Sequence, residues 1–230
     1  MNVRLVKTAL VILLLLWAAA LYVLLLIDNW NDHTGRAIAL MSLGLFSLWV
    51  CAGGGLMWWF HVPLVRMAQR IPLGWRARFI FMATALALVE EAVATLMTNA
   101  APLFGDTTGL AHITASSNYI EVVTRHSVVV FVPMFAGWSI LLSWRSFSPF
   151  SVLVLFGISG MLAESLSFGP QNFLAAGFWI LVYGLMVYLP ASTVPAHRKP
   201  HARPWNYPVA VVFPILCAIP VALVVLWLGN

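Results

Sequence analysis

Charged residues are scarce in this sequence. Asp, Glu, Lys and Arg together make up 8% of the 230 residues, whereas hydrophobic residues make up 62%. Water-soluble globular domains carry roughly 25% charged residues, so the composition excludes that class and excludes a disordered chain as well. It is typical of a protein that crosses a membrane several times.

Cysteine is almost absent. Cys51 and Cys217 lie in separate apolar segments, and neither belongs to a CxxC motif. The sequence therefore excludes a disulfide framework, and we interpret the two thiols as packing residues. Segments that alternate apolar and polar residues with a period of two are also lacking, which excludes a membrane β-barrel.

Long apolar runs are what the sequence has instead. A helix needs about 20 apolar residues to cross the hydrocarbon core. The sequence predicts an all-α, polytopic membrane bundle with about seven transmembrane helices, forming a single transmembrane domain over residues 1–230. The predicted spans are Leu5–Ile27, Ala37–His61, Phe79–Asn99, His126–Trp144, Phe150–Phe168, Gln171–Leu189 and Val209–Leu228.

Glycine and proline refine this prediction. Gly53, Gly54 and Gly55 remove side-chain bulk from the second span and predict close helix packing there, as Gly157 and Gly160 do in the fifth. Between the second and third spans, the prolines of residues 62–78 predict a basic loop without helix.

The twelve Lys and Arg residues predict the orientation. With the N-terminus in the cytoplasm and the C-terminus outside, ten of them face inward and only Arg36 and Arg125 face outward. We interpret the first run as a retained helix rather than a cleaved signal peptide. The basic excess then indicates topology and attraction to anionic lipid, with no nucleic-acid partner, in a prokaryotic-type inner or plasma membrane.

Three glutamates interrupt the apolar spans. Glu90 and Glu91 lie near the middle of the third span, and Glu164 lies within the fifth. A carboxylate inside a membrane is costly, so such residues mark functional sites. We predict that these three are catalytic. Because neighbouring residues point about 100° apart on a helix, we expect one of Glu90 and Glu91 to face a cavity and the other a partner helix.

Further polar residues gather toward the outer half of the predicted bundle. Together with the glutamates they predict a water-filled funnel open to the outside, in which they bind substrate. Glu121 and Arg125, spaced i, i+4, are either an ion pair that fixes a helix start or a charged site at the opening. The predicted binding residues are Asn99, Asn118, Glu121, Arg125, His126, Gln171 and Asn172.

Several site classes are excluded by missing residues. The last span has no lysine, so a retinal Schiff base is impossible. The Glu-Glu pair lacks the arginine and the histidine segments that accompany such a pair in CAAX-type intramembrane proteases, since Thr95 stands at the arginine position. Glu91 is expected ~12 Å below the start of the span that His126 opens, so no metal site is predicted. His197 and His201 are interpreted as lipid-headgroup contacts.

Three functions fit these observations. The first is an intramembrane enzyme that uses carboxylate acid–base chemistry on a lipid, isoprenoid or other membrane-embedded substrate. The second is an accessory subunit of a larger membrane complex that binds lipid, pigment or partner chains. The third is a proton- or cation-coupled transporter, although the inner half lacks the polar residues that a pathway needs. Membrane lipid is an expected partner, a membrane-protein partner or oligomer is possible, and the sequence leaves the cofactor undetermined.

Overall fold

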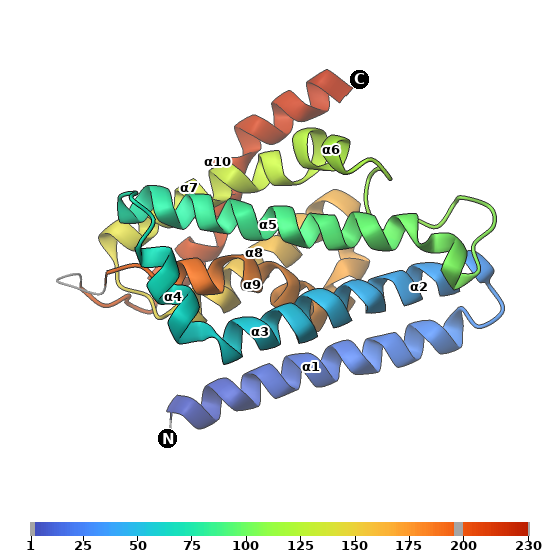
Figure 1. Ribbon diagram of the computed structural model, residues 1–230, viewed down its shortest axis with the longest axis horizontal. Coiled ribbons are helices and arrows are strands. Elements are labelled where there is room, and N and C mark those ends of the chain that lie inside the picture. The colour runs from blue at the N-terminus through green and yellow to red at the C-terminus, as the bar shows by residue number, and fades with distance from the viewer. Residues whose placement is uncertain (1–2, 196–199, 230) are drawn as a thin grey trace.

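The computed structural model describes residues 3–195 and 200–229, and these residues form a helical bundle (Figure 1). Among them the structure records no strand, only an isolated bridge between Ser146 and His201. The α-helices are α1 (Val3–Asp28), α2 (His33–Leu45), α3 (Gly54–Trp59), α4 (His61–Gln69), α5 (Trp75–Asn99), α6 (Tyr119–Glu121), α7 (Val128–Trp144), α8 (Pro149–Phe168), α9 (Ala176–Ser192) and α10 (Asn206–Gly229). Two π-helical segments, η1 (Phe46–Gly53) and η3 (Val122–His126), and two 3-10 segments, η2 (Ala101–Phe104) and η4 (Pro170–Ala175), connect them.

The helices are long and apolar enough for a multi-pass membrane protein. Six of the described helical stretches meet this test, and η3 with α7 forms a seventh, bent stretch. The expected all-helical architecture with about seven spans is therefore confirmed in length and composition. The structure leaves the orientation of the termini as a prediction.

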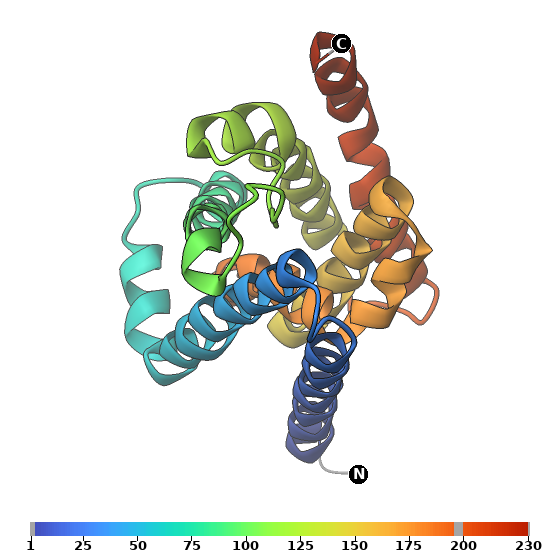
Figure 2. The same cartoon turned by 90° about the vertical axis from the view of Figure 1, so that its right-hand side faces the viewer.

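α9 lies at the centre of the bundle. In its most apolar window 72% of the residues are buried, against 17% in α1 and in α10. Figure 2 shows α1 and α10 at the periphery, with the second half of α10 standing away from the other helices. α9 is therefore the helix around which the others pack, whereas α1 and α10 leave most of their apolar surface uncovered by protein.

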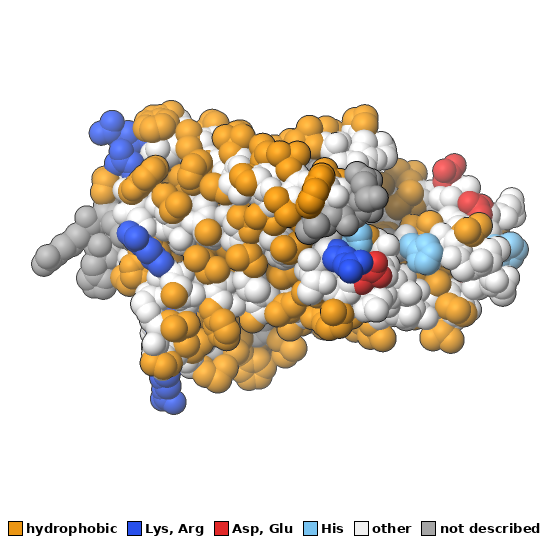
Figure 3. All heavy atoms as spheres, turned by 90° about the horizontal axis from the view of Figure 1, so that it is seen from above, with side chains coloured by type: hydrophobic (Ala, Val, Ile, Leu, Met, Phe, Trp, Pro, Cys, Tyr) orange, Lys and Arg blue, Asp and Glu red, His pale blue; other side chains and the backbone are white. Residues whose placement is uncertain are grey.

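The two ends of the bundle differ in charge. The N-terminus and α4 lie at one end, called the basic end below, and the α1–α2 turn lies at the other, called the loop end (Figure 1). In Figure 3 several Lys and Arg side chains gather at the basic end, whereas acidic and histidine side chains lie toward the loop end. This distribution agrees with the charge asymmetry from which the orientation was predicted.

Glycines let α8 and α9 approach closely, as the sequence predicts for Gly157 and Gly160. A β-carbon at Gly157 would lie 2.2 Å from the carbonyl oxygen of Ile180, and one at Gly184 would lie 2.6 Å from that of Leu153. The prediction for the second span is wrong at Gly55, which is exposed and has no neighbour within 4 Å of such a carbon. Close helix packing therefore occurs at α8 and α9 rather than at that glycine.

The segment between the second and third spans also differs from the prediction. Instead of a loop over residues 62–78, the chain breaks at Phe60 and continues as α4 from His61 to Gln69. Pro63 stands in the first turn of α4, where the missing N–H has no intrahelical partner in any case. The proline thus starts this helix rather than preventing it.

The α8–α9 connection ends well short of the loop end. The indole of Trp17, near the middle of α1, donates to the carbonyl of Leu174 in η4 at 2.9 Å. α1 continues for another eleven residues to Asp28, about 16 Å at 1.5 Å per residue. In Figure 1, α1 likewise extends farther toward the loop end than α8 and α9 do. The turn that carries Gln171 and Asn172 therefore lies short of the level that α1 reaches, and Glu164 lies farther from the loop end than a turn at that level would place it.

The fourth span is longer than predicted and bent. Helical structure begins at Tyr119, seven residues before the predicted start at His126, and bends by 48° where η3 meets α7. Ser127 stands at this bend with φ −109° and ψ −70°. α6, η3 and α7 all contact α5.

Candidate functional site

Glu164 and Tyr183 form the first pair of the site. The Tyr183 hydroxyl on α9 donates a hydrogen bond to the Glu164 carboxylate on α8. Gly160 lies one turn before Glu164, and its missing side chain leaves the space that the Tyr183 ring occupies. Tyr183 is 5% exposed, so its hydroxyl needs a partner within the protein, and Glu164 supplies one.

Glu90 and Glu91 on α5 complete a cluster of three carboxyl groups. They are 5% and 8% exposed, and each interacts electrostatically with Glu164. Tyr183 interacts with all three, most strongly with Glu164. Both side chains are buried, and the expectation that one faces a cavity and the other a partner helix stays a prediction.

The bend in the fourth span contributes hydroxyl groups beside Glu91. The Ser127 side chain interacts with the Glu91 carboxyl group, and its hydroxyl donates to the carbonyl of Val122 at 3.3 Å. Tyr119 lies near enough to Glu91 for an electrostatic interaction, and its hydroxyl donates to the carbonyl of Leu88 at 3.0 Å. π-Helical segments such as η3 are frequent at functional sites, because the wider turn re-aims the side chains that follow. Here the re-aimed residue is Ser127.

No cation neutralises the three acids. In the part of the chain that the structure describes, the groups that act on the glutamate carboxyls are other carboxyls and hydroxyls, with no Lys, Arg or His among them. The three carboxyl groups are therefore not structural ion pairs with cations of the described residues.

Aromatic rings pack around the cluster. The Tyr183 ring stacks on Trp179, one turn earlier on α9, with centroids 5.4 Å apart, and it packs edge-on with Phe131 at 5.4 Å. Phe131 contacts Phe135, which contacts Phe156 on α8 at 5.4 Å. Phe135 and Phe156 lie on the side of the cluster that faces the basic end.

The predicted amide residues hold the backbone in place. Asn99 donates to the carbonyls of Thr95 and Ser117, both at 2.9 Å, and fixes loop 100–118 on α5. Asn118 caps α6 by accepting from the N–H of Ile120 at 3.0 Å. These contacts give Asn99 and Asn118 a structural role, and a substrate-binding role stays a prediction.

The amides of the α8–α9 connection behave in the same way. Gln171 donates to the carbonyl of Phe168 at 2.5 Å, and Asn172 donates to that of Gly169 at 3.2 Å. The Asn172 side chain also accepts from the Trp179 indole at 3.2 Å. Asn172 is tied to the aromatic residue that stacks on Tyr183, whereas no described contact joins these amides to Asn99.

The predicted Glu121–Arg125 ion pair is not among the interactions of the described residues. Glu121 accepts a hydrogen bond from the Ser116 hydroxyl at 2.8 Å instead. Arg125 and His126 are exposed. His126 therefore points away from the acids although Ser127, its neighbour, faces them. Within the described residues, no group of three or more His, Cys, Asp and Glu side chains is arranged to hold a metal ion.

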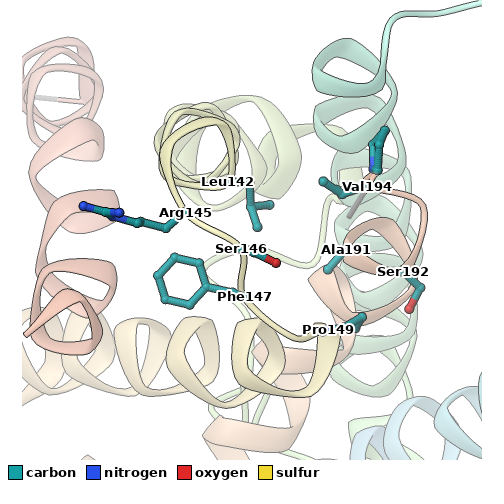
Figure 4. A pocket seen from close by; sticks show the side chains of 9 residues that line it. Leu142, Arg145, Ser146, Phe147, Pro149, Ala191, Ser192 and Val194 are labelled. Atoms are coloured by element: carbon teal, nitrogen blue, oxygen red, sulfur yellow. The ribbon is translucent and has the colours of Figure 1, made fainter. Parts of the chain in front are cut away.

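A separate cavity of about 200 Å³ lies between the α7–α8 link and the end of α9 (Figure 4). None of the three glutamates lines it. Arg145 is its charged residue, and Figure 4 shows the Arg145 side chain directed away from Ser146 and Val194. The other lining residues are Leu142, Phe147, Pro149, Ala191, Ser192 and Pro195. This cavity offers no arrangement of acid, base and nucleophile.

The sequence did not identify every member of the cluster. Tyr183 sits in a uniformly apolar segment, and only the tertiary contact with Glu164 distinguishes it. Ser127 lies beside the predicted start of the fourth span and gave no signal of its own. A comparison with family models, curated proteins and solved structures found no match to this chain.

Proposed function

We propose that the protein is an intramembrane enzyme that uses the glutamate cluster for acid–base chemistry on a lipid, isoprenoid or other membrane-embedded substrate. The proton-transferring residues are Glu164, which accepts a hydrogen bond from Tyr183, and Glu91, which lies beside Ser127. Glu90 interacts electrostatically with both and so influences whether each carboxyl group holds a proton. A general acid or base contributes roughly 10²- to 10⁴-fold to a reaction rate.

The observation that carries this proposal is the convergence of three carboxyl groups, without a cation, from two helices. Carboxyl groups in close contact exchange protons, and their two forms supply an acid and a base at one place. Glu164 is partly exposed whereas Glu90 and Glu91 are buried. This difference supports access for a substrate from the side of Glu164.

A transport function is less well supported. A pathway across the membrane needs polar groups on both sides of the acids. Between the cluster and the basic end, the rings of Phe131, Phe135 and Phe156 pack against one another. The accessory-subunit function rests on the exposed apolar surfaces of α1 and α10, which lipid covers equally well. Both remain alternatives to the enzyme.

The proposal is tested with the purified protein in vesicles made from extracted membrane lipid. Untargeted mass spectrometry would compare lipid-soluble compounds before and after incubation. We expect the wild type to convert at least one compound, and Glu91→Gln and Glu164→Gln to slow this conversion by about 100-fold or more. Glu121→Gln serves as the control, because Glu121 lies outside the cluster and contacts Ser116.

Two further measurements separate the alternatives. Both glutamine variants are expected to insert and fold normally, since a neutral amide is no harder to bury than a carboxylate. If they melt far below the wild type, the carboxylates are structural and the subunit function gains support. If the vesicles instead show proton or cation uptake that depends on Glu91, the protein is a transporter.

A further inference from the structure

Thr95 differs from the other buried hydroxyl residues of the bundle. Its side-chain oxygen is buried, the residue is 4% exposed, and no described group forms a hydrogen bond with it. Hydroxyls inside membrane helices usually donate to the carbonyl one turn earlier. Ser143, Ser159, Ser165 and Ser192 all do so here, at 2.7 to 3.0 Å.

The surroundings of Thr95 are polar. Glu91 lies one turn earlier on α5, so the two side chains share a face with β-carbons about 5–6 Å apart. Ser127, at the bend before α7, interacts with the same carboxyl group, while its hydroxyl donates to the carbonyl of Val122 at 3.3 Å. An oxygen atom held between two hydrogen bonds of about 2.8 Å spans this separation. Buried oxygen ligands of this kind need two to four polar partners, and Thr95 and Glu91 supply two.

The polar side chains in the next turn of α5 have partners other than the Thr95 hydroxyl. Thr98 bonds to Thr114 at 2.8 Å, and the Asn99 amide takes the carbonyl of Thr95 and that of Ser117. Loop 100–118 therefore supplies hydrogen-bond partners for Thr98 and Asn99, which follow Thr95 on α5. The Thr95 hydroxyl has no partner among these groups.

We infer that Thr95 and Glu91 together bind a hydroxyl oxygen, either of a water molecule or of the substrate. In this position the oxygen gives a proton to, or takes one from, the Glu91 carboxyl group, and Thr95 orients it. The chemical role rests on the acid–base function proposed above, whereas the binding itself does not. Thr95 is thus a binding residue for the group that exchanges protons with the acid cluster.

The test is infrared spectroscopy of the full-length protein in vesicles, in ordinary water and in H₂¹⁸O. We expect the wild type to show an O–H stretching band from a buried hydroxyl that Thr95→Val removes and Thr95→Ser retains. Thr124→Val is the matched control, because Thr124 is exposed and already donates to the carbonyl of Ile120 at 2.7 Å.

The isotope identifies the source of the oxygen. A band that shifts in H₂¹⁸O belongs to water. A band that does not shift, together with an alcohol that co-purifies with the wild type and is lost from Thr95→Val, belongs to a lipid substrate. A band that does not shift and is not accompanied by such an alcohol is the stretch of the Thr95 hydroxyl itself. In that case, or if the wild-type and Thr95→Val spectra are identical, the inference is wrong.

Stability supplies an independent readout. Removing a buried hydroxyl that has no partner stabilises a protein, whereas removing one that binds an oxygen does not. We therefore expect Thr95→Val to melt at or below the wild-type temperature, and a higher melting temperature would contradict the inference. Activity separates the two proposals: an unchanged Thr95→Val spectrum with an inactive Glu91→Gln variant overturns this inference alone, and an active Glu91→Gln variant with the expected spectra overturns the enzyme alone.

Discussion

Gly160 on α8 lies directly against the ring of Tyr183 on α9. A β-carbon at position 160 would be 2.2 Å from the ring atom Cδ2, which is far inside van der Waals contact. The glycine therefore sets the distance between the two helices at the level where Tyr183 donates to Glu164. Helix packing and the geometry of the acid cluster depend on the same missing side chain.

Replacing this glycine should disturb both. We expect Gly160→Ala to lower the free energy of unfolding by about 1–3 kcal/mol, because an overpacked contact forces a side chain or a backbone to move. Thermal unfolding in detergent measures the change. Gly55→Ala is the matched control: it adds the same methyl group where nothing lies within 4 Å, and it should be neutral. Equal stability of the two variants would show that α8 and α9 are farther apart than described.

Glu164 and Tyr183 should behave as a coupled pair. Tyr183→Phe removes the donor of a buried hydrogen bond, and Glu164→Gln replaces its carboxyl acceptor with a neutral amide oxygen, so the double variant should lose less than the sum of the single losses. The expected coupling is about 0.5–3 kcal/mol in stability, measured by a double-mutant cycle. Pairing Glu164→Gln with Tyr188→Phe provides the control, since Tyr188 lies against His61 rather than against the cluster. Additive effects in the first cycle would mean that the two residues act separately.

Asp106 predicts how loop 100–118 responds to pH. Hydrogen bonds from the Thr108 hydroxyl and the Ala111 N–H hold the pKa of the Asp106 carboxyl below its ordinary value of 3.8. Because this pKa is lower in the folded state, the ionised Asp106 stabilises the loop fully at a pH above 3.8. This contribution is lost as the pH falls from 3.8 through the folded-state pKa. Hydrogen exchange should show that Asp106→Asn loosens this loop at neutral pH and that the difference from wild type disappears in acid. Asp28→Asn is the control, because Asp28 is exposed at the end of α1. A difference that persists at low pH would rule out the carboxylate as its source.

The predicted orientation can be tested by labelling with a membrane-impermeant thiol reagent. In a background without Cys51 and Cys217, a cysteine at Thr107 should react from outside. One at Arg203 should react only after the membrane is opened. Both positions are exposed. Ten of the twelve Lys and Arg residues face the cytoplasm in this orientation. The reverse pattern at either position would invert the topology and move access to the acid cluster to the other side.

The sequence by itself determined the architecture. Apolar runs of about 20 residues can only be satisfied as helices in a membrane, because every backbone polar group must then bond within its own segment. Glu90, Glu91 and Glu164 stood out for the same reason, since their cost in hydrocarbon is independent of the fold. Gly157 and Gly160 were recognisable because small residues mark close contacts between membrane helices.

Tertiary structure decided which polar groups meet. Tyr183 and Ser127 carry no local signal, and they join the glutamates only because α9 packs against α8 and because the fourth span bends at Ser127. Pattern and spacing describe one helix at a time, so they did not show that the α8–α9 turn ends beside Trp17 in the middle of α1. Relative helix depth depends on packing between helices, and that information lies in contacts between residues more than a hundred positions apart.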